Sequence, residues 1–319
     1  MAAIEFSEEQ SMLLETAADF CRTHSPIDAV RIQIEQEHST TPELWQTMAD
    51  LGWLGVTIPE QYGGLGMSLA DAVPIVESMG RHLMGSPYVA TTLAAQALIT
   101  SGNEEQKTHW LSEIAAGAPA SLALTEEDGN WRLQEITATA TANGDALTLA
   151  GSKCFVLDAT QAKVVVASVM LDGVARLVLI QADQIPSGAL AREVVIDETR
   201  RSYTLQLDGI SVPQSQLLDG ADFVALEQAA MLLLVAEMSG GLAGVLHVII
   251  DYLTTRKQFD QYIGSYQSLK HPTVQILLSM EACRSHLYHA ATLMAAGDAE
   301  AAEEAVRMAK AQGSEAFAF

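Results

Sequence analysis

The sequence predicts an α+β protein in which a β-domain lies between two helical regions of the chain. Three observations support this class. Apolar residues recur at helical spacing up to about residue 120, short β-branched runs alternate with turn signals from 121 to 220, and long helical segments follow. We therefore expect an N-terminal helical domain over residues 1–120, a middle antiparallel β-domain over 121–220 and a C-terminal helical bundle over 221–319.

Capping patterns place the helices of the N-terminal region. Ser7 with Gln10 three residues later predicts a first helix start, and Thr41, Ser68 and Asn103 predict three more. Between the second and third of these starts, residues 59–66 read PEQYGGLG. Three glycines in four positions indicate a loop with unusual backbone angles or a close approach.

The middle region carries short strand patterns separated by the turn signals Asn143-Gly144, Asp172-Gly173 and Asp208-Gly209. Tight turns of this kind favour an antiparallel sheet, and no G-x-G-x-x-G run follows a strand, which argues against a Rossmann domain. The predicted strands cover Ile136–Thr141, Ala146–Leu149, Val164–Val169, Leu177–Ile180 and Tyr203–Leu207.

Helical patterns return near residue 221 and predict bundle helices over about 223–257, 268–296 and 299–317. The last pattern reaches Phe317-Ala318-Phe319 without a helix-stop residue. We therefore expect the bundle to be incomplete as written, so that a further segment or a partner covers this apolar end.

Composition excludes several classes of function. Forty acidic against 17 basic side chains give a net charge of -23, which repels nucleic acid and anionic membranes. The longest apolar stretch, 231–250, is interrupted by Glu237 and a Ser-Gly-Gly run, so we expect no membrane insertion. The three cysteines form no C-x-x-C pair, which predicts neither a disulfide framework nor a zinc site. No signal peptide is evident, and we expect a cytoplasmic protein.

Four local strings occur in an order that resembles the acyl-CoA dehydrogenase family, whose members are flavoproteins. The most specific is similar to the family's Y-x-x-x-R-x-Q-F…I-G-x-F-Q…K-H signature. The strings are the PEQYGGLG loop, Gly151-Ser152-Lys153-Cys154-Phe155-Val156, Asp208-Gly209-Ile210-Ser211-Val212-Pro213, and Tyr252-x-x-x-Arg256-Lys257-Gln258-Phe259 with Ile263-Gly264-Ser265-Tyr266-Gln267 and Lys270-His271.

The resemblance implies an FAD site shared between subunits. Arg256, whose planar guanidinium suits a diphosphate, would reach the adenine dinucleotide half of an FAD held mainly by a neighbouring subunit. By the same resemblance, the other residues in contact with that FAD would be Gln258, Phe259, Tyr266 and Gln267. The resemblance also implies a homo- or hetero-oligomer, as a dimer or tetramer with a related dehydrogenase subunit. It further implies an acyl-CoA substrate and, as electron acceptor, an electron-transfer flavoprotein or a similar protein. The alternative for Arg256 is a surface residue favoured at a helix C-terminus.

In the β-domain, the segment from Leu122 to Thr125 and Glu126 resembles the family segment whose backbone and Thr hydroxyl bind the edge of the isoalloxazine, with Leu124 and Thr125 as the contact residues. By the same resemblance, Phe155 takes the aromatic position beside the flavin. Leu157 occupies the next contact position of that strand. Such contacts position the cofactor and tune its electronics. The alternative for Phe155 is an ordinary strand aromatic in the core.

The sequence departs from the family at the catalytic base. The family uses a carboxylate to remove the substrate's α-proton. By alignment on Arg256, the usual Glu falls beyond Phe319, and the earlier position used by some members is Ala230. Glu237 is the nearest acidic residue on that helix and is the candidate base, but a paired structural role is favoured for it.

Other departures affect the flavin and CoA positions. Asp128-Gly129-Asn130-Trp131 replaces a run of small residues, Leu157-Asp158 replaces a Thr-Asn pair, and Met231 stands where members often carry Arg. Three interpretations stay open. The chain is a catalytic dehydrogenase, or a non-catalytic subunit of a mixed assembly of the type that degrades steroid or other bulky acyl-CoA thioesters, or a flavin monooxygenase or oxidase on the same fold.

Overall fold

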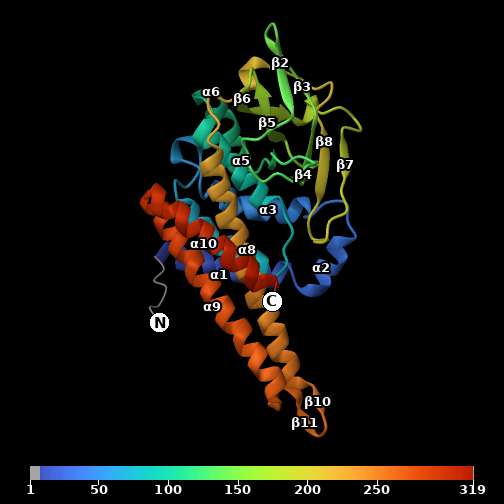
Figure 1. Cartoon of the computed structure of the whole chain (residues 1–319), viewed down its shortest axis with the longest axis vertical. Coiled ribbons are helices and arrows are strands. Elements are labelled where there is room, and N and C mark those ends of the chain that lie inside the picture. Colours follow the sequence, from blue (N-terminus) through green and yellow to red (C-terminus); the bar gives the residue numbers. More distant parts are fainter. Residues whose placement is uncertain (1–7, 319) are drawn as a thin grey trace. The chain divides into compact units, whose positions relative to one another are not determined.

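The computed structural model describes residues 8–318 and confirms the predicted order of helices, then strands, then helices (Figure 1). The Ser7 cap lies outside the described residues. The helices are α1 (Glu8–His24), α2 (Ile27–Ile34), α3 (Pro42–Asp50), α4 (Leu69–Arg81), α5 (Tyr88–Ser101), α6 (Glu104–Gln106), α7 (Ser112–Ala115), α8 (Phe223–Thr255), α9 (Gln267–Ala296) and α10 (Ala299–Ala318).

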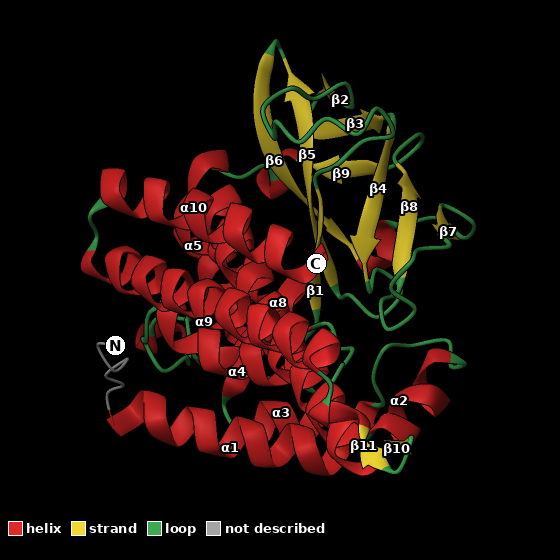
Figure 2. Ribbon diagram, turned by 60° about the horizontal axis from the view of Figure 1, so that its bottom comes forward, coloured by secondary structure: helices red, strands yellow, loops and turns green. Residues whose placement is uncertain are grey.

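The strands occupy the middle of the chain, except for a two-stranded hairpin between α8 and α9 (Figure 2). They are β1 (Ala120–Ala123), β2 (Thr139–Asn143), β3 (Ala146–Ala150), β4 (Ser152–Leu157), β5 (Val164–Leu171), β6 (Val174–Gln181), β7 (Leu190–Arg192), β8 (Ser202–Gln206), β9 (Ser211–Pro213), β10 (Lys257–Gln258) and β11 (Gln261–Tyr262).

The chain divides into two compact units, each assembled from separate stretches of sequence. The bundle unit is drawn from Met1–Val30, Ser68–Met84 and Ala230–Phe319. The sheet unit is drawn from Arg31–Met67 and Gly85–Ala229.

Side-chain caps form at three of the predicted helix starts. Thr41 accepts a hydrogen bond from the main-chain N–H of Leu44 at 3.2 Å, at the start of α3. Ser68 forms a capping box with Asp71 before α4, and Asn103 forms one with Gln106 before α6. These caps satisfy N–H groups that a helix start leaves unpaired.

The sheet unit holds two sheets. The six-stranded sheet has the order β1-β5-β2-β3-β9 with β6 on β5, and the three-stranded sheet has the order β4-β8-β7. Most pairings are antiparallel, as predicted, but β1 pairs with β5 in parallel, and β2 does so at one position. Turn residues in the sequence predict only hairpins such as β2–β3 and β5–β6. They could not predict the parallel pairing of β1 with β5, because these two strands are not joined by a tight turn.

Glycines let the backbones of α4 and α8 approach closely in the bundle unit. A Cβ on Gly80 would overlap the carbonyl oxygen of Glu237, and a Cβ on Gly240 would overlap that of Glu77. A Cβ on Gly244 would lie 2.6 Å from the carbonyl oxygen of Arg81. These three positions therefore require glycine for packing rather than for backbone angle.

A buried carboxylate connects three helices of the bundle unit. Glu77 of α4 accepts hydrogen bonds from Ser239 of α8 at 2.8 Å, and from Arg284 and Tyr288 of α9 at 3.1 and 2.6 Å. A buried charge needs partners of this kind to offset its lost hydration. Helix α8 is long and apolar enough to cross a membrane by length and composition alone, but its glycine contacts with α4 are those of a packed bundle.

Candidate functional site

The predicted signature residues of the C-terminal region come together at one tip of the bundle unit. This tip consists of the end of α8, the β10–β11 hairpin and the start of α9 (Figure 1). The main-chain carbonyl of Arg256 accepts from Ile263 N–H at 2.9 Å. The hydroxyl of Tyr266 donates to the carbonyl of Gln258 at 3.1 Å. The side chains of Arg256, Gln258, Phe259 and Gln267 are exposed, and Tyr266 is half-buried.

The hairpin turn at this tip is strained. Its two central residues, Phe259 and Asp260, have φ of 52° and 59°, which matches a type I′ turn. Asn and Gly are the usual residues there, and a bulky aromatic with positive φ is uncommon. Phe259 is also 87% exposed. A strained, exposed aromatic three residues after an exposed arginine makes this tip a candidate contact surface.

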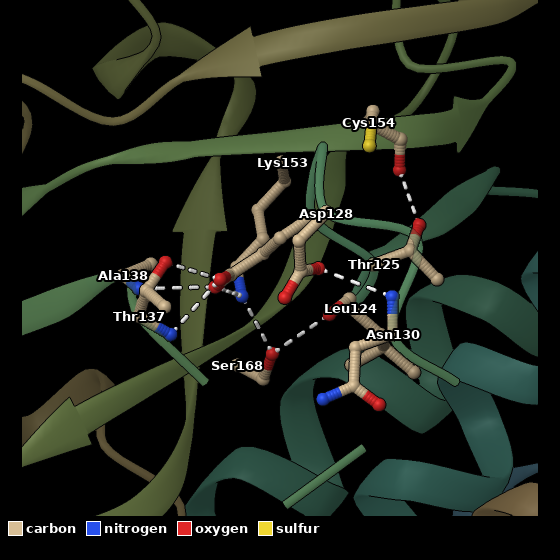
Figure 3. Close-up of polar contacts among 10 residues, drawn as sticks. Leu124, Thr125, Asp128, Asn130, Thr137, Ala138, Lys153, Cys154 and Ser168 are labelled. Atoms are coloured by element: carbon tan, nitrogen blue, oxygen red, sulfur yellow. Dashed lines mark hydrogen bonds and ion pairs between the residues drawn. The ribbon is translucent and has the colours of Figure 1, made fainter. Parts of the chain in front are cut away.

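The predicted flavin edge of the sheet unit spans two sheets. Leu124 and Thr125 follow β1 of the six-stranded sheet, whereas Phe155 and Leu157 belong to β4 of the three-stranded sheet. Thr125 and Cys154 connect the two. Cys154 N–H donates to the Thr125 carbonyl at 3.0 Å, and Thr125 Oγ1 donates to the Cys154 carbonyl at 2.6 Å (Figure 3). The structure therefore brings these predicted residues together.

Phe155 sits in a β-bulge that turns its ring outward. The pairing of β4 with β8 shifts between Lys153 and Val156, and Phe155 has φ of 55° with 53% of its surface exposed. Its N–H donates to the carboxylate of Glu193 at 3.2 Å. The exposed ring contradicts the alternative of a core aromatic.

A buried ion pair lies directly beside this edge. Lys153 Nζ bonds Glu126 Oε1 at 2.7 Å and Ser168 Oγ at 2.9 Å, and Ser168 Oγ donates to the Leu124 carbonyl at 3.3 Å (Figure 3). Glu126 also accepts from the main-chain N–H groups of Thr137 and Ala138 and from the Thr137 hydroxyl.

These partners set the ionisation of the pair. Burial alone raises the pKa of Glu126, but the hydrogen bonds from Lys153, Thr137 and Ala138 outweigh it and bring that pKa down to about 2. Burial lowers the pKa of Lys153, and the bond to Glu126 opposes this shift. We therefore treat the pair as ionised at neutral pH.

Asp158 follows the flavin edge and is buried. Its carboxylate accepts a hydrogen bond from Ser39, and its N–H donates to the Arg201 carbonyl at 2.7 Å. Burial raises the pKa of Asp158 above its ordinary value. The hydrogen bond from Ser39 and the charges of Arg200 and Arg201 lower that pKa, but by less than burial raises it. With φ of 52°, Asp158 turns the chain at the end of β4.

Glu237 lies on α8, nineteen residues before Arg256, which is about 28 Å along a helix. It is half-buried and already takes part in a polar interaction, and its backbone lies against Gly80. This placement agrees with the structural role that the sequence favours. Its role as a base stays a prediction.

The exposed residues suit the parts of FAD. An exposed guanidinium such as that of Arg256 suits an anionic diphosphate in a chain with few cations. The exposed rings of Phe155 and Phe259 suit flat aromatic groups. Thr125 Oγ1 donates its proton to the Cys154 carbonyl, so toward a ligand it can act only as a hydrogen-bond acceptor. An acceptor at this place suits the N–H of the flavin pyrimidine ring. Leu157 offers no side-chain hydrogen bond.

The sequence did not predict Ser168 and Glu193 as supports of this site. Lys153 and Glu126 stand within the family-like segments, but no supporting role was predicted for either of them. The Lys of the 151–156 string is the signal that could have indicated the ion pair, because Lys is rarely buried without a partner. Among residues 8–318, no group of three or more His, Cys, Asp or Glu could hold a metal ion.

Comparison with known proteins places these residues in a family context. The model "Acyl-CoA dehydrogenase, N-terminal domain" matches residues 7–118, and "Acyl-CoA dehydrogenase, C-terminal domain" matches residues 226–319. The chain is 30% identical to acyl-CoA dehydrogenase FadE12 of Mycobacterium tuberculosis, over 97% of this chain and 83% of FadE12.

Two solved structures whose names pair two proteins share the fold. The Tcur3481-Tcur3483 steroid ACAD G363A variant matches with a TM-score of 0.83 and 27% identity, over 97% of this chain and 86% of that chain. The ChsE4-ChsE5 complex of Mycobacterium tuberculosis matches with a TM-score of 0.85 and 23% identity, over 99% and 86%.

Proposed function

Because the chain belongs to the acyl-CoA dehydrogenase family, we propose that it is a subunit of an FAD-dependent acyl-CoA dehydrogenase and completes the FAD site of a neighbouring subunit. The family's reaction is a flavin-dependent oxidation at a CH–CH bond of an acyl-CoA. The observation that carries the proposal is the tip itself. There an exposed Arg256 stands beside the strained and exposed Phe259.

The chain's own residues would hold the cofactor in two places. Arg256 and Gln258 offer donors to the diphosphate and its surroundings, and the Phe259 ring offers an apolar face. In the sheet unit, Thr125 and Phe155 would contact the isoalloxazine. When bound, FAD supplies the chemistry by accepting the two electrons of the substrate's Cα–Cβ oxidation.

We propose a mixed assembly in which a related, complete dehydrogenase subunit supplies the base. Ala230 cannot accept a proton, and Leu157 cannot hydrogen-bond to the flavin with its side chain. The similarity to the two-protein complexes Tcur3481-Tcur3483 and ChsE4-ChsE5 supports this arrangement. A homo-oligomer that uses Glu237 as its base is the alternative outcome of the test.

The proposed substrate is a bulky acyl-CoA such as a steroid side-chain thioester. The similarity to the Tcur3481-Tcur3483 steroid dehydrogenase supports this choice. We propose that the assembly works in the cytoplasm and passes electrons to an electron-transfer flavoprotein or a similar acceptor.

The test is to produce the full chain alone and together with a related, complete dehydrogenase subunit of the same organism. Mass, flavin absorbance and acyl-CoA-dependent reduction of ferricenium would be measured for each, with steroid side-chain CoA and isovaleryl-CoA as substrates. We expect a yellow complex that reduces ferricenium, and no activity from the lone chain. Activity of the lone chain that is abolished by Glu237→Gln would reject the mixed assembly in favour of the homo-oligomer.

A flavin that stays oxidised with every acyl-CoA tested would contradict the dehydrogenase function itself. Rapid oxygen consumption by the reduced flavin would instead favour a monooxygenase or oxidase.

A further inference from the structure

We propose that Lys153 is a positioning residue that sets the flavin edge of this chain's own β-domain. This inference rests on the proposed contact of Thr125 and Phe155 with the isoalloxazine, and it adds the residue that positions them. It starts from the division of the edge between two sheets, with Leu124 and Thr125 on one and Phe155 and Leu157 on the other.

Lys153 joins the two halves of this edge. It belongs to β4 of the three-stranded sheet, yet its ammonium group bonds Glu126 and Ser168 on the side of the six-stranded sheet. Ser168 bridges Lys153 and Leu124, because its hydroxyl accepts a hydrogen bond from Lys153 and donates one to the carbonyl of Leu124 (Figure 3). The fully buried side chain of Lys153 thus connects the strand of Phe155, through Ser168, to the backbone of Leu124.

Stability alone is a poor reason for this arrangement. Burying an ammonium and a carboxylate costs several kcal/mol per ion before their attraction is counted, and well-packed apolar side chains often do as well or better. What apolar groups cannot supply is direction. Hydrogen bonds fix the carbonyl of Leu124 and the carboxylate of Glu126 to within a few tenths of an ångström.

Two further contacts connect β1 and the segment that follows it with β4. Ser121 Oγ donates to the carbonyl of Leu157 at 2.5 Å, and Thr125 pairs with Cys154 through main-chain and side-chain bonds. Lys153 and Glu126 immediately adjoin Cys154 and Thr125 in the sequence. A movement of Lys153 or Glu126 therefore shifts Cys154 and Thr125, whose pairing holds the predicted contact residues Thr125 and Phe155 in place. Binding sites lose affinity when such supports move by about 1 Å.

Ser168→Ala is the most informative variant, because it cuts the link to Leu124 while the Lys153–Glu126 ion pair remains. Val169→Ala is the matched control. Val169 is a neighbour on β5 with a fully buried side chain on the opposite face of the strand, and its truncation lowers stability without touching the link. Lys153→Met removes the whole connection.

The measurements are the dissociation constant of FAD, the visible absorption and circular dichroism of the flavin, and the thermal unfolding temperature of the co-purified assembly. We expect Ser168→Ala to weaken FAD binding about fivefold, the equivalent of one net hydrogen bond, and to change the flavin spectrum. Lys153→Met should have a larger effect of the same kind. Val169→Ala should lower the unfolding temperature and leave the flavin spectrum unchanged.

If Ser168→Ala matches the wild type in FAD affinity and spectrum, the inference is overturned, whatever Lys153→Met does to folding. A different result is FAD held only in the partner subunit's β-domain, at half of one FAD per subunit, with a content that Ser168→Ala does not change. That result would overturn the inference while the proposed function stands. A wild-type assembly without FAD would overturn both.

Discussion

Single buried charges carry much of the organisation of this chain. Lys153 and Glu126 link two sheets, Glu77 links three helices, and Arg201 donates to the main-chain carbonyls of Gln33, Gln36 and Glu37 at and after the end of α2. Each of these charges has defined hydrogen-bond partners, which is the condition for burying it. Their loss leaves partners unpaired, so we expect their effects to exceed those of surface ion pairs.

Glu126 gives a pH dependence with a definite sign. Its folded pKa of about 2 lies below the ordinary value of 4.5, so its contribution is complete above pH 4.5 and is lost as the pH falls toward 2. We predict that Glu126→Gln flattens the loss of unfolding free energy between pH 4.5 and 2, measured by denaturant unfolding at a series of pH values.

Glu135→Gln is the control for this experiment. Glu135 forms an exposed ion pair with Arg132 and should leave the acid limb of the stability curve as it is in the wild type. Equal slopes for wild type and Glu126→Gln over the same pH range would show that Glu126 is not held ionised by its partners.

Residue motifs identified candidate contact residues but not the hydrogen-bond partners that hold them. Phe155 and Arg256 were found because their motif strings are specific, and the structure places both at exposed positions. The positive φ of Phe155 and Phe259 could not be foreseen, because neither residue type favours that conformation. The partners of Lys153 come from distant strands, and local sequence patterns do not report such contacts.

At the scale of elements, the capped and amphipathic helices were predictable, whereas α5 was not. Helix α5 is apolar on nearly all sides and almost completely buried, so it has no periodic pattern to detect. The parallel pairing of β1 with β5 was missed for a related reason. Turn residues report neighbouring strands in the sequence, whereas a parallel pair depends on the course of the chain between them.

The glycines of α8 allow a test in which two effects have opposite signs. Replacing Gly by Ala inside a helix normally stabilises it by about 1 kcal/mol. At Gly240, however, the added Cβ would overlap the main-chain carbonyl of Glu77, which cannot move without shifting α4. We predict that Gly240→Ala destabilises the protein by about 1–3 kcal/mol in chemical denaturation.

Ala243→Gly in the same helix is the reference for the propensity term alone, and it should cost no more than about 1 kcal/mol. A Gly240→Ala protein as stable as the wild type, or more stable, would show that α4 and α8 do not approach as closely as described.

For the whole molecule, the net charge limits how an anionic cofactor can be held. A net charge of -23 leaves few cations to hold an anionic cofactor, so each exposed arginine near a ligand matters. The chain's family was recognisable from four strings, and the family models match its two helical regions. Its partner and acyl substrate were not recognisable in this way, because in the proposed assembly they depend on surfaces that a second subunit would complete.

The most direct test of the account is the FAD content of the purified assembly carrying Arg256→Ala, measured by flavin absorbance per mole of complex. Lys257→Ala removes an equal charge from the next residue of the same tip and is the control. The account predicts that Arg256→Ala loses most of its FAD while Lys257→Ala keeps the wild-type content. Full flavin occupancy in Arg256→Ala, with the assembly intact, would contradict it.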